Sequence, residues 1–317
     1  MNIKGRIDYV QLLKNNGILI VFFLICIGLT VLTPYFLTTN NILNIIRQTS
    51  IYGIIAVGMT FVILTGGIDL SVGSILALSG MIAAGMMKNN GMGEFPAAVI
   101  AILVGGGIGL LNGLLITVGK IAPFVVTLGM LTIARGVTLI YSKGYPVSGF
   151  SPAFRQLGGG YVLGIPIPVI IFILTVALAW FILNHTRLGR YTYALGGNEE
   201  TVKLSGINVR FYKTMVYVIV GIASALSALI LTSRLNSAEA IAGQGYELDV
   251  IAAVVIGGTS LSGGRGSIIG TLIGALLIGV INNGMNLLGI SPYFQQVVKG
   301  ALIIGAVILD RLREETN

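Results

Sequence analysis

The 317-residue chain is 55% apolar and only 9% charged, a composition that excludes an ordinary soluble globular protein and indicates an integral membrane protein. Its formal net charge of +8 does not indicate a nucleic-acid partner, because Lys and Arg are concentrated between the apolar segments. A single Cys26 and a single His185 exclude an internal disulfide and a histidine cluster for metal binding or catalysis.

Long apolar runs follow one another along the chain and predict an all-α, polytopic membrane protein with one transmembrane domain over residues 1–317. The first run, Gly17 to Phe36, follows three cations as the core of a signal peptide would. At about 20 residues and without a small-residue cleavage site, it is expected to remain as a span. We expect ten spans, near residues 17–36, 42–64, 73–88, 95–118, 122–142, 162–184, 214–233, 246–260, 267–288 and 292–310.

The distribution of cations predicts the orientation of these spans. With a cytoplasmic N-terminus, twelve Lys and Arg residues, Lys4, Arg6 and Lys14 among them, fall in cytoplasmic segments and four fall on the other side. Because cytoplasmic loops carry an excess of Lys and Arg, this bias predicts that both termini are cytoplasmic. It also places the long polar interval from Arg187 to Lys213 in the cytoplasm.

This polar interval contains a predicted short helix from Glu199 to Ser205. Asn198 is a good N-cap, and the acidic Glu199 and Glu200 suit the first turn. Gly206 can take the left-handed conformation that ends a helix. A two-turn helix is marginal alone in water, so we expect it to pack against its flanking segments or a partner protein. A loop helix without a partner is the other interpretation.

An internal repeat divides the chain. Gly66 to Gly73 reads GGIDLSVG and Gly257 to Gly264 reads GGTSLSGG, with five of eight positions identical. Repeats with interrupted helices at their interface are typical of transporter folds. A channel or a membrane scaffold can also arise by duplication. The two repeats are expected over about residues 42–145 and 246–311.

Each copy of the motif predicts a helix break. In the first copy, Gly66 can end one helix, and Asp69 or Ser71 can cap the next. The second copy has Ser260 in place of Asp69, which indicates a shared structural role. Asp69 therefore has two interpretations, as a helix cap and as a pathway or gating residue, since an ionisable group near apolar spans is a functional candidate.

Other polar residues fall within the predicted spans. Arg135 is expected to face a partner or a water-filled cavity, because an unpaired guanidinium is costly inside a membrane. Asn112 and Asn282 occupy matching places after the two motifs and could bond between helices or contact a polar substrate. Glu247 and Asp249 open the span near 246–260, where they supply first-turn charge.

Sequence motifs for catalysis or nucleotide binding are missing. The chain has no G-x-x-x-x-G-K-[ST] phosphate loop, and Cys26 lies in an apolar run without a base. We therefore expect a protein that is not an enzyme and has no cofactor or metal of its own. Energy for transport would come from an ion gradient or from another chain.

Four stretches resemble the permease subunits of bacterial ABC sugar importers, nearest to the ribose permeases. They are GMTFVILTGGIDLSVGSILALSG (58–80), NGLLITVGKIAPFVVTLG (112–129), LGRYTYALGGNEETVKLSGINV (188–209) and YELDVIAAVVIGGTSLSGGRGSIIGTLIGALLIG (246–279). The resemblance covers about Phe36 to Arg311. It implies a homodimer in the lipid of the bacterial cytoplasmic (inner) membrane, a cytoplasmic subunit that binds ATP, and an extracytoplasmic sugar-binding protein.

The resemblance also implies roles for individual residues. An E-A-A-x-x-x-G pattern engages the ATPase in this family, and Glu200 to Gly206 occupies it here, with Thr201 and Val202 in place of the alanines. The expected ATPase-coupling residues are Gly197, Asn198, Glu199, Glu200, Ser205 and Gly206. The expected pathway or gating residues are Asp69, Asn112, Arg135 and Asn282, and Glu247 and Asp249 are expected to dock the binding protein or to start a helix.

The predicted function is therefore that of a transmembrane permease for a monosaccharide, with ribose as the first candidate, powered by a separate ATPase. A related permease for another sugar, a nucleoside or an autoinducer is one alternative. An ion-coupled secondary carrier is another, but it would need membrane carboxylates, and apart from Asp69 the predicted spans have few.

Overall fold

The computed structural model describes residues 9–314. Lys4 and Arg6, two of the cations used to predict the orientation, lie outside this range. The helices are α1 (Tyr9–Leu32), α2 (Thr39–Leu64), α3 (Val72–Asn89), α4 (Glu94–Thr117), α5 (Pro123–Ser142), α6 (Pro152–Gly159), α7 (Ile167–His185), α8 (Arg187–Gly197), α9 (Glu199–Leu204), α10 (Val209–Leu235), α11 (Tyr246–Ile256), α12 (Ile268–Leu287) and α13 (Pro292–Glu314). Short strands β1 (Val147–Ser148) and β4 (Ser237–Ala238) pair antiparallel, as do β2 (Tyr161–Val162) and β3 (Ile165–Pro166).

The prediction of an all-α polytopic membrane protein is confirmed. Within the described residues, seven helices are long and apolar enough to cross a membrane, and shorter apolar helices cover Gly17–Leu32 and Pro292–Ile308. The predicted span near 246–260 is wrong as a full span. Its helix, α11, has 11 residues, which at 1.5 Å per residue make about 16 Å of a hydrocarbon core about 30 Å thick.

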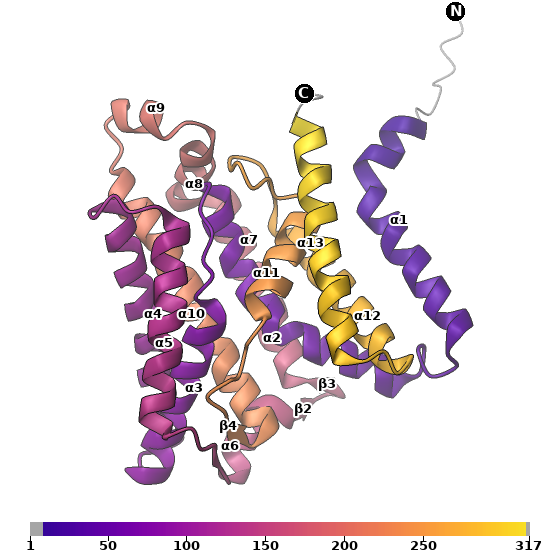
Figure 1. The fold of residues 1–317 in the computed structure, drawn as a ribbon, viewed down its shortest axis with the longest axis vertical. Coiled ribbons are helices and arrows are strands. Elements are labelled where there is room, and N and C mark those ends of the chain that lie inside the picture. The colour runs from indigo at the N-terminus through magenta and orange to yellow at the C-terminus, as the bar shows by residue number, and fades with distance from the viewer. Residues whose placement is uncertain (1–8, 315–317) are drawn as a thin grey trace, which may run out of the picture.

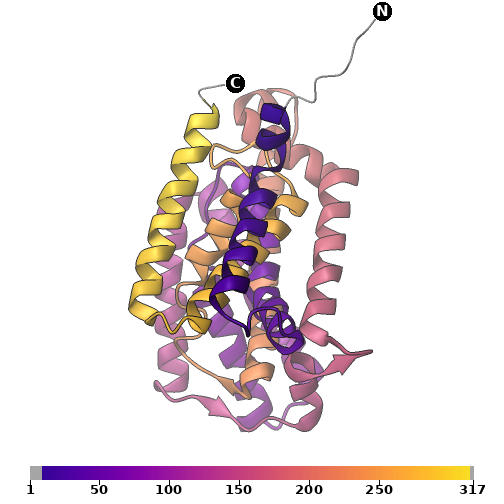
Figure 2. The same cartoon turned by 90° about the vertical axis from the view of Figure 1, so that its right-hand side faces the viewer.

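The helices stand side by side between two faces (Figure 1). Helix α9 lies on one face, where α1 begins and α13 ends; we call it the α9 face. Helix α6 and the short strands lie on the opposite face. Helix α1 lies at the right-hand edge of the bundle in Figure 1 and in front of it in Figure 2, so it is on the outside, where it packs against α12.

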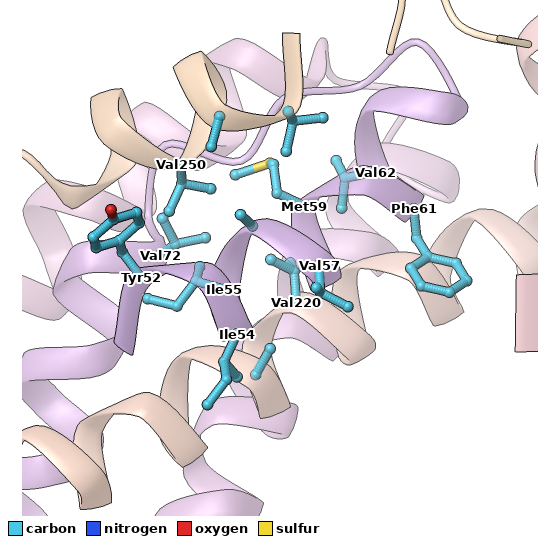
Figure 3. Close-up of a cluster of buried hydrophobic side chains, with 14 of the residues drawn as sticks. Tyr52, Ile54, Ile55, Val57, Met59, Phe61, Val62, Val72, Val220 and Val250 are labelled. Carbon is cyan, nitrogen blue, oxygen red and sulfur yellow. The ribbon is translucent and has the colours of Figure 1, made fainter. Parts of the chain in front are cut away.

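The centre of the bundle is α2. From Thr49 to its end at Leu64 every residue of this helix is buried, and it packs against α7, α8, α10, α11 and α12. Figure 3 shows the apolar side chains of α2 meeting Val72, Val220 and Val250 from α3, α10 and α11. A helix that is apolar all round is expected in such a buried position.

Glycine allows α4 and α10 to pack backbone against backbone. A Cβ on Gly105 would collide with the carbonyl oxygen of Gly221, and a Cβ on Gly221 would collide with that of Gly105. The high glycine content thus serves close helix contact here, as small residues do in other membrane bundles.

Candidate functional site

Two helices begin inside the bundle instead of at a face. After α2 ends at the α9 face, residues 65–71 run inward to the start of α3. From the opposite face, residues 236–245 run inward to the start of α11 (Figure 1). The two starts touch, since a Cβ on Gly73 would collide with the carbonyl oxygen of Gly243. Helix ends that meet inside a membrane protein are typical of transport sites.

Both copies of the repeated motif break a helix as predicted, but Asp69 does not cap α3. The N-cap of α3 is Ser71, and that of α12 is Ser267. Asp69 Oδ1 instead accepts the backbone N–H of Ser71 at 2.8 Å, and Ser260 Oγ accepts that of Ser262 at 3.3 Å. The predicted capping by Asp69 and Ser260 is therefore wrong, and each side chain instead closes a turn with the residue two positions on.

The first turn is part of a fully buried polar cluster. Asn112 of α4 donates from Nδ2 to Ser71 Oγ at 3.0 Å and to Asp69 Oδ2 at 3.5 Å. The side chains of Asp69, Ser71 and Asn112 are all 0% exposed. Two predicted pathway residues, Asp69 and Asn112, therefore lie together and join the motif loop to α4.

We expect Asp69→Asn to preserve the fold and Asp69→Leu to destabilise it. An Asn oxygen can still accept the N–H of Ser71, whereas Leu would leave buried donors of Ser71 and Asn112 without an acceptor, at a cost of about 1–3 kcal/mol each. Thermal unfolding of both variants in detergent, with uptake in vesicles, measures the difference. A stable Asp69→Asn protein without uptake would assign the essential role to the negative charge.

The other inward segment is held by Arg135, which has the partner that the sequence required. From α5, its Nη1 donates to the carbonyl oxygens of Ala240 and Ala242, the latter at 3.0 Å. Glu247 lies close enough to interact electrostatically with the guanidinium. Arg135 thus supplies hydrogen bonds to an irregular backbone that a membrane interior would otherwise leave unpaired.

Glu247 and Asp249 lie in the first turn of α11, as the helix-start interpretation predicts. Glu247 accepts the backbone N–H of Gly245 at 3.2 Å. Asp249 is 5% exposed and pairs with Lys299 of α13 at 2.8 Å. Asn282 of α12 also hydrogen-bonds Asp249, so this carboxylate joins three helices. Docking of a binding protein by either residue stays a prediction.

The predicted surface helix is present as α9. Asn198 Oδ1 accepts the backbone N–H of Thr201 at 2.9 Å, which confirms the N-cap. Gly206 has φ +77°, the left-handed conformation expected after the helix. Glu199 pairs with Lys213 of α10 at 2.7 Å and so ties α9 to the next helix. The ATPase-coupling roles of all six residues, Gly197, Asn198, Glu199, Glu200, Ser205 and Gly206, stay predictions.

Helix α8 was missed by the sequence analysis. Its end packs on the last residue of α2 and on the second motif copy: a Cβ on Gly196 would collide with the carbonyl oxygen of Leu64 and the backbone nitrogen of Gly264. These two atoms are themselves hydrogen-bonded at 2.9 Å. Tyr193 donates its hydroxyl to the carbonyl oxygen of Gly266 at 2.8 Å. Burial raises the pKa of Tyr193, which keeps this hydroxyl a donor.

A signal for α8 was present in the sequence. Thr186 is its N-cap and accepts the backbone N–H of Gly189 at 3.4 Å. Leu188, Thr192 and Leu195 then follow at the spacing of one helix face, and Thr192 and Leu195 are buried. The consequence for function is that α8 connects α9 to the end of α2 and to the second motif copy.

Comparison with known proteins identifies the architecture. Residues 41–307 match the family described as branched-chain amino acid transport system / permease component. The chain belongs to this permease family. The ribose import permease protein of Bacillus subtilis (strain 168) is 52% identical over 310 residues, which are 97% of this chain and 96% of that protein. No solved structure matches.

Two further relatives are permeases for other sugars. The D-allose transport system permease protein of Escherichia coli (strain K12) is 47% identical over 92% of this permease and 90% of its own length. The galactose/methyl galactoside import permease protein of the same strain is 36% identical over 99% of this chain and 98% of that protein. The resemblance to permease subunits of ABC sugar importers is therefore confirmed, and the permease is a multi-pass membrane transport subunit rather than an enzyme.

Proposed function

We propose that this permease forms the membrane pathway of an ATP-driven importer for ribose. The observation that carries the proposal is the identity to ribose import permeases, 52% for the protein of Bacillus subtilis and 48% for that of Escherichia coli (strain K12), over at least 96% of every chain compared. Identity to the galactose relative is 36%. Allose is the second candidate substrate, since the allose relative is 47% identical.

Uptake into membrane vesicles tests the substrate. The permease would be co-produced with a candidate ATPase subunit and a candidate binding protein, and ATP would be supplied inside the vesicles. We expect ATP-dependent uptake of labelled ribose that excess unlabelled ribose removes and that galactose does not. Uptake of allose or galactose in preference to ribose would contradict the proposal, and uptake driven by an ion gradient without ATP would favour a secondary carrier.

The ATP-binding subunit is proposed to dock on the α9 face. Two features support this site. Helix α9 is exposed except for Val202 and lies in the segment that resembles the ATPase-coupling loop. Helix α8, directly before it, packs on the end of α2 and on the second motif copy. Motion of α9 would therefore be transmitted through α8 to the end of α2 and to the second motif copy, by contacts between backbone atoms. The binding protein would then dock on the opposite face.

We expect the α9 face to be cytoplasmic and the opposite face to be extracytoplasmic. In a Cys26→Ser background, Lys203→Cys and Ser148→Cys would place single thiols on the two faces, at residues of α9 and β1. An impermeant thiol reagent added to intact cells should label the second variant and not the first, and inverted vesicles should give the reverse. Labelling of both from one side would overturn the orientation.

A second copy of the permease is proposed to cover the side of the bundle formed by α5, α11 and α13. The inward segment 236–245 is irregular and partly open there, with Ile241 61% exposed. Irregular backbone at membrane depth is tolerated where protein or a water-filled cavity covers it, but not against lipid. A dimer across this side would enclose Arg135, Glu247 and Lys299 and place the sugar pathway beside them.

A further inference from the structure

A groove of about 850 Å³ opens at the α9 face beside the helices that carry the proposed coupling segment. It lies between the turn from α4 to α5 and the stretch from α9 to the start of α10. We call it the basic groove. Its lining residues are Ile116, Thr117, Lys120, Ile121, Ala122, Pro123, Glu199, Lys203, Ile207, Asn208, Val209, Arg210 and Lys213.

The charge of the basic groove is largely unbalanced. It contains four cations and one carboxylate. Glu199 pairs with Lys213 at 2.7 Å. The other three cations, Lys120, Lys203 and Arg210, have no carboxylate at ion-pair distance within the part of the chain that the structure describes. Cations gathered in this way without counter-charges fit an anionic ligand.

The remaining lining is apolar and continues onto the surface of the bundle. Ile116, Ile121 and Pro123 form part of the groove wall. Next to it, Val118 and Phe124 are 58% and 55% exposed. Only 33% of the apolar, membrane-spanning stretch of α4 and 28% of that of α5 is buried inside the protein, so most of the surface of both helices is available to lipid. An anionic group bound at the cations would therefore have lipid-facing helices directly beneath it.

We propose that the basic groove binds the head group of an anionic phospholipid, whose acyl chains lie along α4 and α5. The cations match the phosphate and the apolar wall matches the glycerol and the first methylenes. A soluble phosphate or nucleotide would leave the apolar part unfilled. Basic pockets between spans at the membrane surface are established sites for anionic head groups. This site does not depend on which sugar the permease carries.

Fluorescence quenching by brominated lipids tests the site. The native Trp180 is removed as Trp180→Phe, and Phe124→Trp then places the probe beside the groove. Ile140→Trp, 79% exposed near the other end of α5, provides a matched probe. We expect brominated phosphatidylglycerol to quench the groove probe at a much lower mole fraction than brominated phosphatidylcholine does. The two lipids should quench the distant probe equally.

The substitutions Lys120→Gln and Arg210→Gln should each lower the preference of the groove for phosphatidylglycerol over phosphatidylcholine by about fivefold. Lys143→Gln is the matched control, because Lys143 flanks the other end of α5 and has nearly the same left-handed φ, 51° against 54° for Lys120. It should leave the preference unchanged. Equal quenching of the groove probe by both lipids, or a preference that survives both substitutions, would overturn the proposal.

Two further measurements distinguish a lipid from the other possible ligands of the basic groove, a soluble anion and the ATPase subunit. Loss of the preference in millimolar inorganic phosphate would show a site for soluble anions and not for lipid. Loss of ATPase co-purification in Lys120→Gln and Arg210→Gln, with lipid quenching unchanged, would assign the groove to the partner protein. Either result would reject the lipid site.

Discussion

Gly196→Ala is expected to abolish uptake and to lower the stability of the permease. The added methyl group would meet the carbonyl oxygen of Leu64 and the backbone nitrogen of Gly264. Because both are main-chain atoms, neither can turn aside as a flexible side chain could. Overpacking of this kind costs about 1–3 kcal/mol. It would also separate α8 from the end of α2 and from the second motif copy, through which we propose that ATP-driven motion is transmitted.

The adjacent glycine supplies the control. A Cβ on Gly197 would meet nothing within 4 Å, so Gly197→Ala should leave the unfolding temperature and the amount of inserted protein unchanged. Uptake, substrate-stimulated ATP hydrolysis and thermal unfolding would be measured on both variants. Normal uptake with Gly196→Ala would show that the contact of α8 with the motif ends is not needed for coupling.

Arg135→Met is expected to prevent transport while leaving insertion into the membrane intact. The substitution keeps an apolar stem of similar length but removes the donors to Ala240 and Ala242 and the positive charge near Glu247. Each buried carbonyl left without a donor costs about 1–3 kcal/mol. The inward segment should then become loose, since these bonds fix it against α5.

Thermal unfolding in detergent and ribose uptake would report on Arg135→Met. Arg135→Lys should retain part of the activity, because an ammonium can replace one of the two bonds but not the planar donor geometry. Arg155→Met, at an exposed cation of α6, is the control for loss of positive charge and should behave as the unmodified permease does. Full uptake with Arg135→Met would remove Arg135 from the proposed pathway.

The order and extent of most helices could be predicted from the sequence because a membrane span needs only length and hydropathy. Asn198 and Gly206 were equally predictable, since caps depend on local geometry. The short length of α11, 11 residues instead of a full span, could not be predicted in this way. Glu247 and Asp249 were recognised as a helix start, yet the fact that this start lies inside the bundle depends on Arg135 and Gly73, which are distant in sequence.

The candidate site shows the same division. Each predicted polar residue in the spans has a partner, but the partners are set by packing. Asp69 bonds Ser71 and Asn112, whereas Asp249 bonds Lys299, so the two carboxylates belong to different clusters. Nothing local in the sequence separates them. The close contact made by Gly196 of α8 was missed. This contact depends on glycine having no side chain, and a single glycine leaves no periodic pattern in the sequence.

The burial of α2 has a consequence for biogenesis. This helix is made early, while the α10 and α11 that cover it follow more than a hundred residues later, a delay on the order of ten seconds at bacterial synthesis rates. Until then it must lie in lipid. It can do so because Ser50 and Thr60, polar residues of its buried stretch, donate their hydroxyls to carbonyl oxygens of Ile46 and Ala56 in the same helix. The nascent central helix therefore exposes little unpaired polarity to the bilayer, and it can wait for its partners without a chaperone for these groups.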